Sequence, residues 1–414
     1  MLYSYEIIFG VIKMNLKHAY YRAFQKVFKV AMCFLPWAPP QLMTGPGSVK
    51  ELATLVKSKG IKKVLIVTDK GLMSLNLLDS LFGALESNGV EYVVYDEVQP
   101  NPTIPNIESA RKLYVDNNCE GIIAFGGGSP MDCAKVAGAR VVRPNKSIPK
   151  MRGIMQVMKP IPPFFAVPTT AGTGSETTLA AVVSNPDTHE KYPINDPVLR
   201  PKYAVLDPEL TVGLPPHITS TTGMDALTHA VEAYIGRSGV KSTDENALKA
   251  TKMIFENIFT AYSEGKDLKA RENMLLASFY AGAAFTRAYV GYVHSIAHNL
   301  GGMYGIPHGL ANAIILPYVL DWYGESAHKK LAELSKVAKT DAGCTTDAQK
   351  ANAFIAAIRD LNAKMNIPDK IDGIQEKDIP TIAQRALKEA NPLYPVPKIM
   401  DQADVEFVIR KLMK

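Results

Sequence analysis

Aspartate and histidine side chains recur at four-residue spacing in two stretches of this chain. Asp225 and His229 lie in the string Met-Asp-Ala-Leu-Thr-His, and His294 and His298 lie in Val-His-Ser-Ile-Ala-His. On a helix, residues four apart lie one turn apart on the same face, so each pair can close on one ion. His308 follows in Pro-His-Gly. A lone histidine on an apolar helix is usually a core or surface side chain, but five such groups indicate a metal site. One carboxylate with neutral imidazoles suits Fe(II), Zn, Mn or Co.

A run of glycines follows an apolar segment and precedes a helical pattern. The apolar residues 121–125 lead into Gly126, Gly127, Gly128 and Ser129, and residues 131–140 have helical character. Glycine lets a backbone approach a phosphate closely, and the start of a helix offers free N–H groups with a favourable dipole. The pattern is typical of a pyrophosphate cradle, although turns need glycine in any case.

Two further polar positions follow apolar segments. Thr169 and Thr170 belong to Pro-Thr-Thr-Ala-Gly-Thr-Gly-Ser-Glu, whose hydroxyls could contact phosphate or ribose or could cap the next helix. Asp69 ends the first apolar run, where ligands of open α/β sheets bind. Its carboxylate could accept hydrogen bonds from a ribose diol and repel a 2′-phosphate, or it could cap the following helix. Asp69 precedes the glycine run, opposite to the usual order, so we expect a variant of the Rossmann sheet.

Alternating patterns divide the chain into two halves. Short apolar runs at 64–67, 92–95, 121–125, 164–167 and 203–206 predict strands, and helical patterns at 49–58, 72–88 and 107–117 flank the first three. This alternation favours βαβ units and a mostly parallel Rossmann-like sheet. Beyond Pro216 the periodicity is helical throughout, for example at 243–264, 268–288 and 348–365. We therefore expect an α/β domain at 41–212, an all-α domain at 213–414, and a site between them.

Length, charge and cysteine usage narrow the class of protein. A chain of 414 residues exceeds the length at which a single hydrophobic core usually stops growing. Its content of 47% hydrophobic and 21% charged residues is ordinary for a globular protein. The net charge of +6 comes without a basic run interleaved with aromatics, so we expect no nucleic-acid partner. The four cysteines, none in a Cys-x-x-Cys pair, indicate a reducing compartment, by default the cytoplasm.

The first forty residues form a separate segment with a helical pattern. Tyr20, Phe24, Val27, Phe28 and Ala31 would share one face, with basic residues elsewhere on the turn, and the helix should end before Pro36. Such a helix could lie on a membrane surface or bind a partner. Because aromatic faces are most often buried, we favour packing on its own domain or on a second subunit. Charged residues interrupt the apolar N-terminus, so we expect neither a signal peptide nor a membrane span.

Both histidine stretches resemble the metal-binding signatures of the iron-containing, or group III, alcohol dehydrogenase family, and the likeness begins near Gln41. The resemblance implies four metal ligands, Asp225, His229, His294 and His308, with His298 beside them as a proton carrier. Only this resemblance favours iron, with zinc as the other candidate. The string Gly-Gly-Gly-Ser-Pro-Met-Asp-Cys-Ala-Lys also resembles the dinucleotide loop of the family. It implies cofactor contacts from Gly126, Gly127, Gly128, Ser129, Asp132, Thr169, Thr170 and Lys191.

The resemblance also bears on the substrate pocket. Lys191 matches a family lysine near the phosphates, but a solvated surface lysine explains it equally well. Thr178 and Phe285 are implied as pocket residues, and Ala180 would leave room nearby. The pocket volume, and hence the particular alcohol or aldehyde, does not follow from the sequence.

The resulting hypothesis is an NAD-linked, metal-dependent alcohol dehydrogenase that interconverts a primary alcohol and its aldehyde. The metal would polarise the alcohol oxygen, hydride would pass to the nicotinamide, and His298 would relay the proton. NAD is expected over NADP because of Asp69. A homodimer or larger homo-oligomer is expected. The alternatives are a glycerol dehydrogenase-like or other polyol dehydrogenase of the same fold, and a non-catalytic binding or filament-forming protein.

Overall fold

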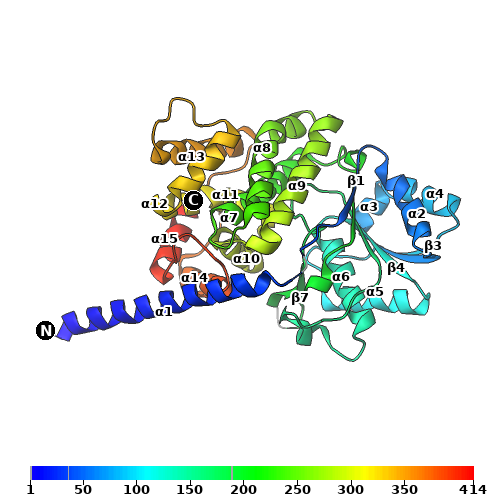
Figure 1. The fold of residues 1–414 in the computed structure, drawn as a ribbon, viewed down its shortest axis with the longest axis horizontal. Helices are drawn as coiled ribbons and strands as arrows, with labels where there is room; N and C mark the ends of the chain where they lie inside the picture. Colours follow the sequence, from blue (N-terminus) through cyan, green and yellow to red (C-terminus); the bar gives the residue numbers. More distant parts are fainter. Residues whose placement is uncertain (1, 36, 188–189) are drawn as a thin grey trace.

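A six-stranded parallel sheet forms the centre of the N-terminal half (Figure 1). The computed structural model describes residues 2–35, 37–187 and 190–414. The sheet has the strand order β1-β9-β6-β4-β2-β3, and all of its pairs are parallel. Its strands are β1 (Gln41–Thr44), β2 (Lys63–Val67), β3 (Glu91–Tyr95), β4 (Gly121–Gly126), β6 (Phe164–Pro168) and β9 (Tyr203–Leu206). A smaller sheet contains β5 (Gly153–Ile154), β8 (Glu190–Asn195) and β7 (Ala180–Asn185), in that order.

Helices cover both faces of the large sheet, which explains why its central strands are apolar throughout. On β2, Val64 and Ile66 belong to one buried cluster, and Leu65 and Val67 belong to another. The helices of this half are α2 (Ser48–Ser58), α3 (Lys70–Ser74), α4 (Asp79–Ser87), α5 (Ile104–Asp116) and α6 (Gly128–Val142). Because α2 and α4 contribute to the first cluster and α5 and α6 to the second, the strands are buried on both sides.

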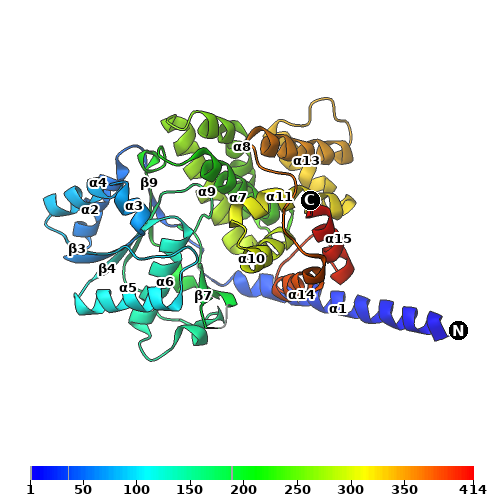
Figure 2. The ribbon, with the colours of Figure 1, turned by 180° about the vertical axis from the view of Figure 1, so that it is seen from behind.

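The C-terminal half is built from helices around its own core (Figure 2). They are α7 (Pro216–Ile235), α8 (Lys241–Ser263), α9 (Leu268–Ala288), α10 (Tyr292–Tyr304), α11 (His308–Tyr323), α12 (Glu325–Ala338), α13 (Asp347–Lys364), α14 (Ile379–Ala390) and α15 (Gln402–Leu412). Helix α7 is buried along almost its whole length, so most of its polar side chains must find partners inside the protein. The expectation of a parallel α/β half followed by a helical half is confirmed.

The structure corrects several local predictions. The pattern at 72–88 does not form one helix, because Asn76 adopts a left-handed backbone with φ of 55° and separates α3 from α4. Strands β1, β5, β7 and β8 were not predicted. The proposed boundary at 212/213 lies between the end of β9 at Leu206 and the start of α7 at Pro216.

The two halves meet where the loop after β6 packs against α9. Gly174 has φ of +59°, and a Cβ placed there would lie 2.7 Å from the Cα of Gly282. Thr286 of α9 accepts a hydrogen bond from the backbone N–H of Leu179 through its Oγ1 at 3.3 Å. A small shared cluster adds Leu206 and Leu275 to this junction. The backbones of the loop after β6 and of α9 can approach this closely because neither Gly174 nor Gly282 has a side chain.

Helix α1 (Leu2–Met32) runs past α14, and its first turns extend beyond the rest of the body (Figure 1). The prediction of a helix that ends before Pro36 is confirmed. Its apolar face is only partly covered by its own chain, because Phe24 and Phe28 are half-buried whereas Tyr20, Val27 and Ala31 are exposed. Packing on a second subunit, the other expectation, stays a prediction. Within the described part of the chain, no helix has the length and apolar character that crossing a membrane requires.

We predict that Gly282→Ala destabilises the junction between the halves. The new methyl group would lie 2.8 Å from the carbonyl oxygen of Gly174 and would overlap the Thr177 hydroxyl. Overpacking of this kind lowers the free energy of unfolding by about 1–3 kcal/mol, which urea denaturation measures. The control is Gly83→Ala in α4, where a Cβ meets nothing within 4 Å and a helix prefers alanine. Equal stability of Gly282→Ala and the native protein would show that the junction adjusts freely.

Candidate metal centre

Helices α7 and α10 bring three potential metal ligands together inside the helical half. Asp225, His229 and His294 are buried, and each offers one ligand atom within 4.8 Å of the others. The Oδ1 of Asp225 lies 4.0 Å from His229 Nδ1 and 3.7 Å from His294 Nε2. The one-turn spacing of Asp225 and His229 places both on the same face of α7, as the sequence predicts.

Two nitrogen atoms of this cluster indicate that its residues fit a metal ion. His229 Nδ1 and His294 Nε2 are buried, and neither has a hydrogen-bond partner among the described residues. An unpaired buried polar atom is unfavourable unless something satisfies it. Both atoms face the same carboxylate, and imidazole nitrogen with carboxylate oxygen is a donor set that Fe(II) and Zn accept.

His308, at the start of α11, lies beside these three residues but outside their compact group. Its Nε2 is 3.4 Å from Asp225 Oδ1, and its side chain is 39% exposed. Asn312, one turn further on α11, donates to Asp225 Oδ1 at 2.7 Å and lies 3.1 Å from His308 Nε2. Asn312 is fully buried and therefore holds the carboxylate in place from a third helix.

Glu232 fixes His294 from the side opposite to Asp225. Its Oε2 lies 2.6 Å from His294 Nδ1 and accepts from the backbone N–H of Gly291, while its Oε1 accepts from Val293. Since a carboxylate only accepts, Nδ1 carries the hydrogen and Nε2 is the atom that faces Asp225. A carboxylate behind a ligating histidine fixes the ring and raises its basicity.

The ionisable groups of the cluster strongly influence one another. Burial opposes ionisation of Asp225, but the imidazoles of His229, His308 and His294 outweigh it and hold the pKa of the carboxyl well below its usual range. Burial lowers the pKa of His229 to about 3, so this ring is neutral near pH 7. Burial also disfavours protonated His294, yet Asp225 and Glu232 together raise its pKa to about 9. Binding of a cation to His294 therefore releases a proton.

His298 lies one turn beyond His294 on α10, next to the ligand candidates. Its Nδ1 is 2.7 Å from Glu389 Oε1 on α14, and its ring stacks on His308 with centroids 5.1 Å apart. The side chain is 38% exposed, unlike the buried His294. His298 is thus held between the cluster and a carboxylate, with access to water.

The two predicted pocket residues have different surroundings. Phe285 of α9 stacks on His229, with ring centroids 4.0 Å apart and an interplanar angle of 13°. The Oγ1 of Thr178 is buried and accepts from Lys135 at 3.0 Å, so its hydroxyl is already engaged. Phe285 is therefore the one that lines the metal cluster directly.

The glycine run and the threonine loop lie against each other at the end of β4. Gly126 has φ of +146°, and a Cβ there would lie 2.6 Å from Pro130. A Cβ at Gly127 would lie 3.3 Å from the Thr170 hydroxyl, and one at Gly128 would lie 3.1 Å from Thr173. Helix α6 begins at Gly128, so its first N–H groups point out of the same edge. Side chains larger than hydrogen would fill this cradle.

Asp132 contacts the protein rather than open space. Its carboxylate accepts from Ser175 Oγ at 3.1 Å and from the backbone N–H of Val182 at 2.9 Å. Burial raises the pKa of Asp132, and the ammonium of Lys135 opposes this effect. Lys135 is fully buried and donates to oxygen atoms of Ser175, Thr178 and Ala180. Both residues therefore shape the loop opposite the glycines.

The remaining predicted cofactor residues are more dispersed. Asp69 Oδ1 accepts from the N–H of Leu72 at 3.0 Å and caps α3, which is the alternative that the sequence left open. Thr169 is buried, and Ser129 accepts from the N–H of Asn101 at 3.1 Å. Lys191 is exposed on β8.

Sequence reasoning missed three residues that support the cluster. Glu232 follows Asp225 and His229 at positions seven and three residues later, so helical spacing could have identified it. Asn312 follows His308 by four residues and carries the same signal. Glu389 lies 91 residues from His298, and no local pattern connects them.

Comparison with known proteins identifies the family of the chain. Two family models match the chain, "Iron-containing alcohol dehydrogenase" over residues 39–208 and "Fe-containing alcohol dehydrogenase family, C-terminal" over residues 219–413. The chain is 40% identical over 353 residues to the 1,3-propanediol dehydrogenase of Citrobacter freundii, covering 84% of this chain and 90% of the relative. It is 35% identical over 353 residues to the NAD-dependent methanol dehydrogenase of Bacillus methanolicus, covering 85% and 92% respectively.

A crystal structure of a 1,3-propanediol oxidoreductase superimposes with a TM-score of 0.88 at 35% identity. The superposition covers 92% of this chain and all of that structure. Because the family models span both halves and the relatives align over nearly their whole length, the chain belongs to the iron-containing alcohol dehydrogenase family.

Proposed function

We propose that this protein interconverts a primary alcohol and its aldehyde, with a nicotinamide cofactor and one divalent metal ion. The observation that carries the proposal is the buried group of Asp225, His229 and His294, in which two imidazole nitrogens have no hydrogen-bond partner among the described residues. Family membership supports the reaction class, because the relatives are named as dehydrogenases of alcohols and diols.

Asp225, His229, His294 and His308 would hold the metal, with His308 completing the set from α11. The family name supports iron, and the donor atoms suit Fe(II) as well as Zn. Asn312 and Glu232 would keep Asp225 and His294 oriented toward the ion. When bound, the metal supplies Lewis-acid polarisation of the substrate oxygen and the nicotinamide supplies hydride acceptance or donation.

The cofactor would lie at the carboxyl edge of the large sheet. Gly126, Gly127 and Gly128 leave room for phosphate beside Thr170, and the start of α6 offers N–H groups. NAD is supported by the relative named as an NAD-dependent methanol dehydrogenase. Asp69 is a weaker support, since one of its oxygens already caps α3. Ser129, Thr169 and Lys191 stay proposed contacts.

His298 would move the substrate proton, because it adjoins the cluster and is partly exposed. Glu389 accepts from its Nδ1 and so leaves Nε2 as the atom available to a proton. Phe285 shields the His229 side of the cluster from water and offers an apolar wall to a short carbon chain. Homo-oligomerisation and a cytoplasmic location stay predictions from the sequence.

The metal assignment is tested by His229→Ala. We expect this variant to lose bound metal and to lose turnover together, by more than the roughly 100-fold typical of residues that only support a ligand. Elemental analysis and a steady-state assay with ethanol and NAD measure the two effects. The matched control is His217→Ala, which removes an exposed histidine from the same helix. A full metal complement in His229→Ala would remove the central claim.

The role of Glu232 is tested by Glu232→Gln. One amide oxygen cannot replace a carboxylate that accepts from three N–H groups, so the orientation of His294 should suffer. We expect metal affinity to fall roughly 10–100-fold, measured by chelator competition. The exposed Glu245→Gln serves as the control. Unchanged affinity would mean that the backbone alone positions His294.

His298→Ala separates proton transfer from metal binding. We expect the metal to be retained and turnover to fall about 10²–10⁴-fold, the usual contribution of a general acid–base group. Glu389→Gln should slow turnover in the same direction, because it weakens the support of the same ring. If the metal content of His298→Ala instead falls in step with activity, His298 is a ligand and not the proton carrier.

A further inference from the structure

Helix α1 presents an apolar face to solvent. Its exposed large side chains, together with one in the following turn, are between 61% and 85% exposed: Leu16, Tyr20, Val27, Val30 and Phe34. The spacing of Leu16, Tyr20, Val27 and Val30 by four, seven and three residues places these four on one side of α1, over about 21 Å at 1.5 Å per residue. These four side chains and Phe34, in the turn that follows Met32, are here called the apolar stripe.

The opposite face of α1 is attached to the protein by polar contacts. Arg22 donates to the carbonyl oxygens of Val396 and Pro397 at 2.7 and 3.0 Å, and Gln25 donates to those of Pro392 and Tyr394. Lys29 donates to the carbonyl oxygen of Gly239 at 2.9 Å. These bonds fix the rotation of the helix, so the stripe faces outward as part of the folded structure.

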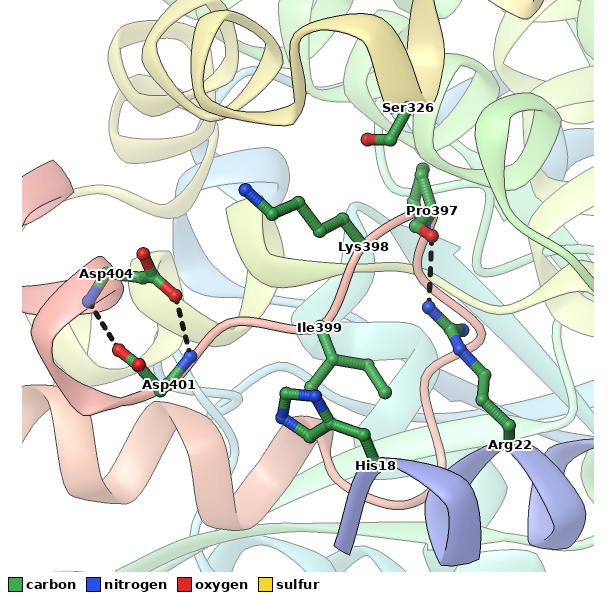
Figure 3. Close-up of a pocket in the computed structure, with 8 residues that line it drawn as sticks. All are labelled: His18, Arg22, Ser326, Pro397, Lys398, Ile399, Asp401 and Asp404. Carbon is green, nitrogen blue, oxygen red and sulfur yellow. Dashed lines mark hydrogen bonds between the residues drawn. The ribbon is translucent and has the colours of Figure 1, made fainter. Parts of the chain in front are cut away.

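A cavity separates the start of this attached face from the helical half (Figure 3). Its volume is about 420 Å³, and its lining includes His18 and Arg22 of α1 together with Lys398, Asp401 and Asp404. Figure 3 shows Arg22 reaching Pro397, while Asp401 and Asp404 bond to each other's backbone and cap α15. Charged side chains of α1 and of the helical half thus meet around this cavity on the attached side of the helix.

The charges of α1 are all of one sign over the part whose side chains are described. Residues 16–35 contain Lys17, Arg22, Lys26 and Lys29 and no aspartate or glutamate. Arg22 and Lys29 are used inward, whereas Lys17 and Lys26 are exposed. At about 100° per residue, Lys17 and Lys26 lie on opposite edges of the apolar stripe. Lysines that flank an apolar stripe complement an anionic lipid surface.

A second copy of α1 fits this face less well. Pairing two such stripes would bring lysines together with no carboxylate between them. One stripe of five side chains is also much smaller than the roughly 20–30 residues per partner of a stable interface. The family model begins at residue 39, so α1 lies outside the part of the chain that carries the proposed chemistry.

We propose that α1 binds this enzyme peripherally to anionic membranes, with Leu16, Tyr20, Val27, Val30 and Phe34 inserted among the lipids and Lys17 and Lys26 at the headgroups. The helix lies in the plane of the bilayer surface and does not cross it. The catalytic halves stay on the aqueous side, because α1 holds them through its opposite face.

Vesicle co-sedimentation of the full-length protein tests this proposal. The probes are vesicles of phosphatidylcholine with phosphatidylserine and vesicles of phosphatidylcholine alone. We expect the native protein to sediment with the first and to bind the second several-fold more weakly. An ionic strength of about 1 M, where the Debye length is about 3 Å, should weaken binding to the first. Sedimentation of the protein with neither kind of vesicle overturns the proposal.

Two variants separate the apolar and electrostatic contributions. Val27→Glu/Val30→Glu should lower partitioning to phosphatidylserine vesicles about tenfold or more, and Lys17→Gln/Lys26→Gln should lower it several-fold. The matched control is Phe259→Glu/Phe407→Glu, which changes exposed apolar residues on α8 and α15 and should bind as the native protein does. Turnover should be unchanged in all three, which also shows that they are folded.

Sedimentation velocity without vesicles tests whether a second copy of the chain, rather than a membrane, covers the stripe. If Val27→Glu/Val30→Glu lowers the oligomeric mass while vesicle binding is absent, a second copy covers the stripe and the membrane proposal is wrong. If the variant binds vesicles as strongly as the control, the stripe is not the binding surface. Neither result contradicts the proposed dehydrogenase function, which is tested separately.

Discussion

An ionised carboxylate inside a helical core is the constraint on which the site depends. Asp225 is buried, and its charge must be balanced by groups that arrive from other parts of the chain. His229 comes from α7 itself, His294 from α10, and Asn312 and His308 from α11. Three helices are thus held in one arrangement, because moving any of them would remove part of the compensation of the carboxylate.

The α/β half depends on a second buried charge. Lys135 donates to several oxygens of the segment that follows the threonine loop, and Asp132 accepts from two groups of the same segment. This ties α6, which begins in the glycine cradle, to the loop that packs on α9 through Gly174. The cofactor edge and the metal helices are therefore connected by a short rigid path, so their separation does not depend on flexible side chains.

Residue spacing can identify groups that share one element, although Glu232 and Asn312 were missed, and it cannot show which groups from different elements meet. The pair of Asp225 and His229 was recognisable because one turn of α7 contains both. The sequence allowed Asp69 either to bind a ribose or to cap the next helix, and only the structure shows that its oxygen caps α3. Strand β8 escaped notice because Pro193 interrupts its alternation, and proline argues against an interior strand. The sequence could not show which face of α1 turns toward its own chain, because hydrogen bonds from Arg22 and Gln25 to distant carbonyl groups attach that face.

The contacts of Glu232 show what determines the geometry of the site. Glu232 and His294 are 62 positions apart, and α8 and α9 form the whole intervening excursion. Closing such a loop carries an entropic cost, which the packing of α8 and α9 against α7 offsets. The contact between Glu232 and His294 is therefore a product of the whole helical core and not of the sequence near the two residues. The position of one proposed ligand, His294, accordingly depends on residues that lie outside the cluster.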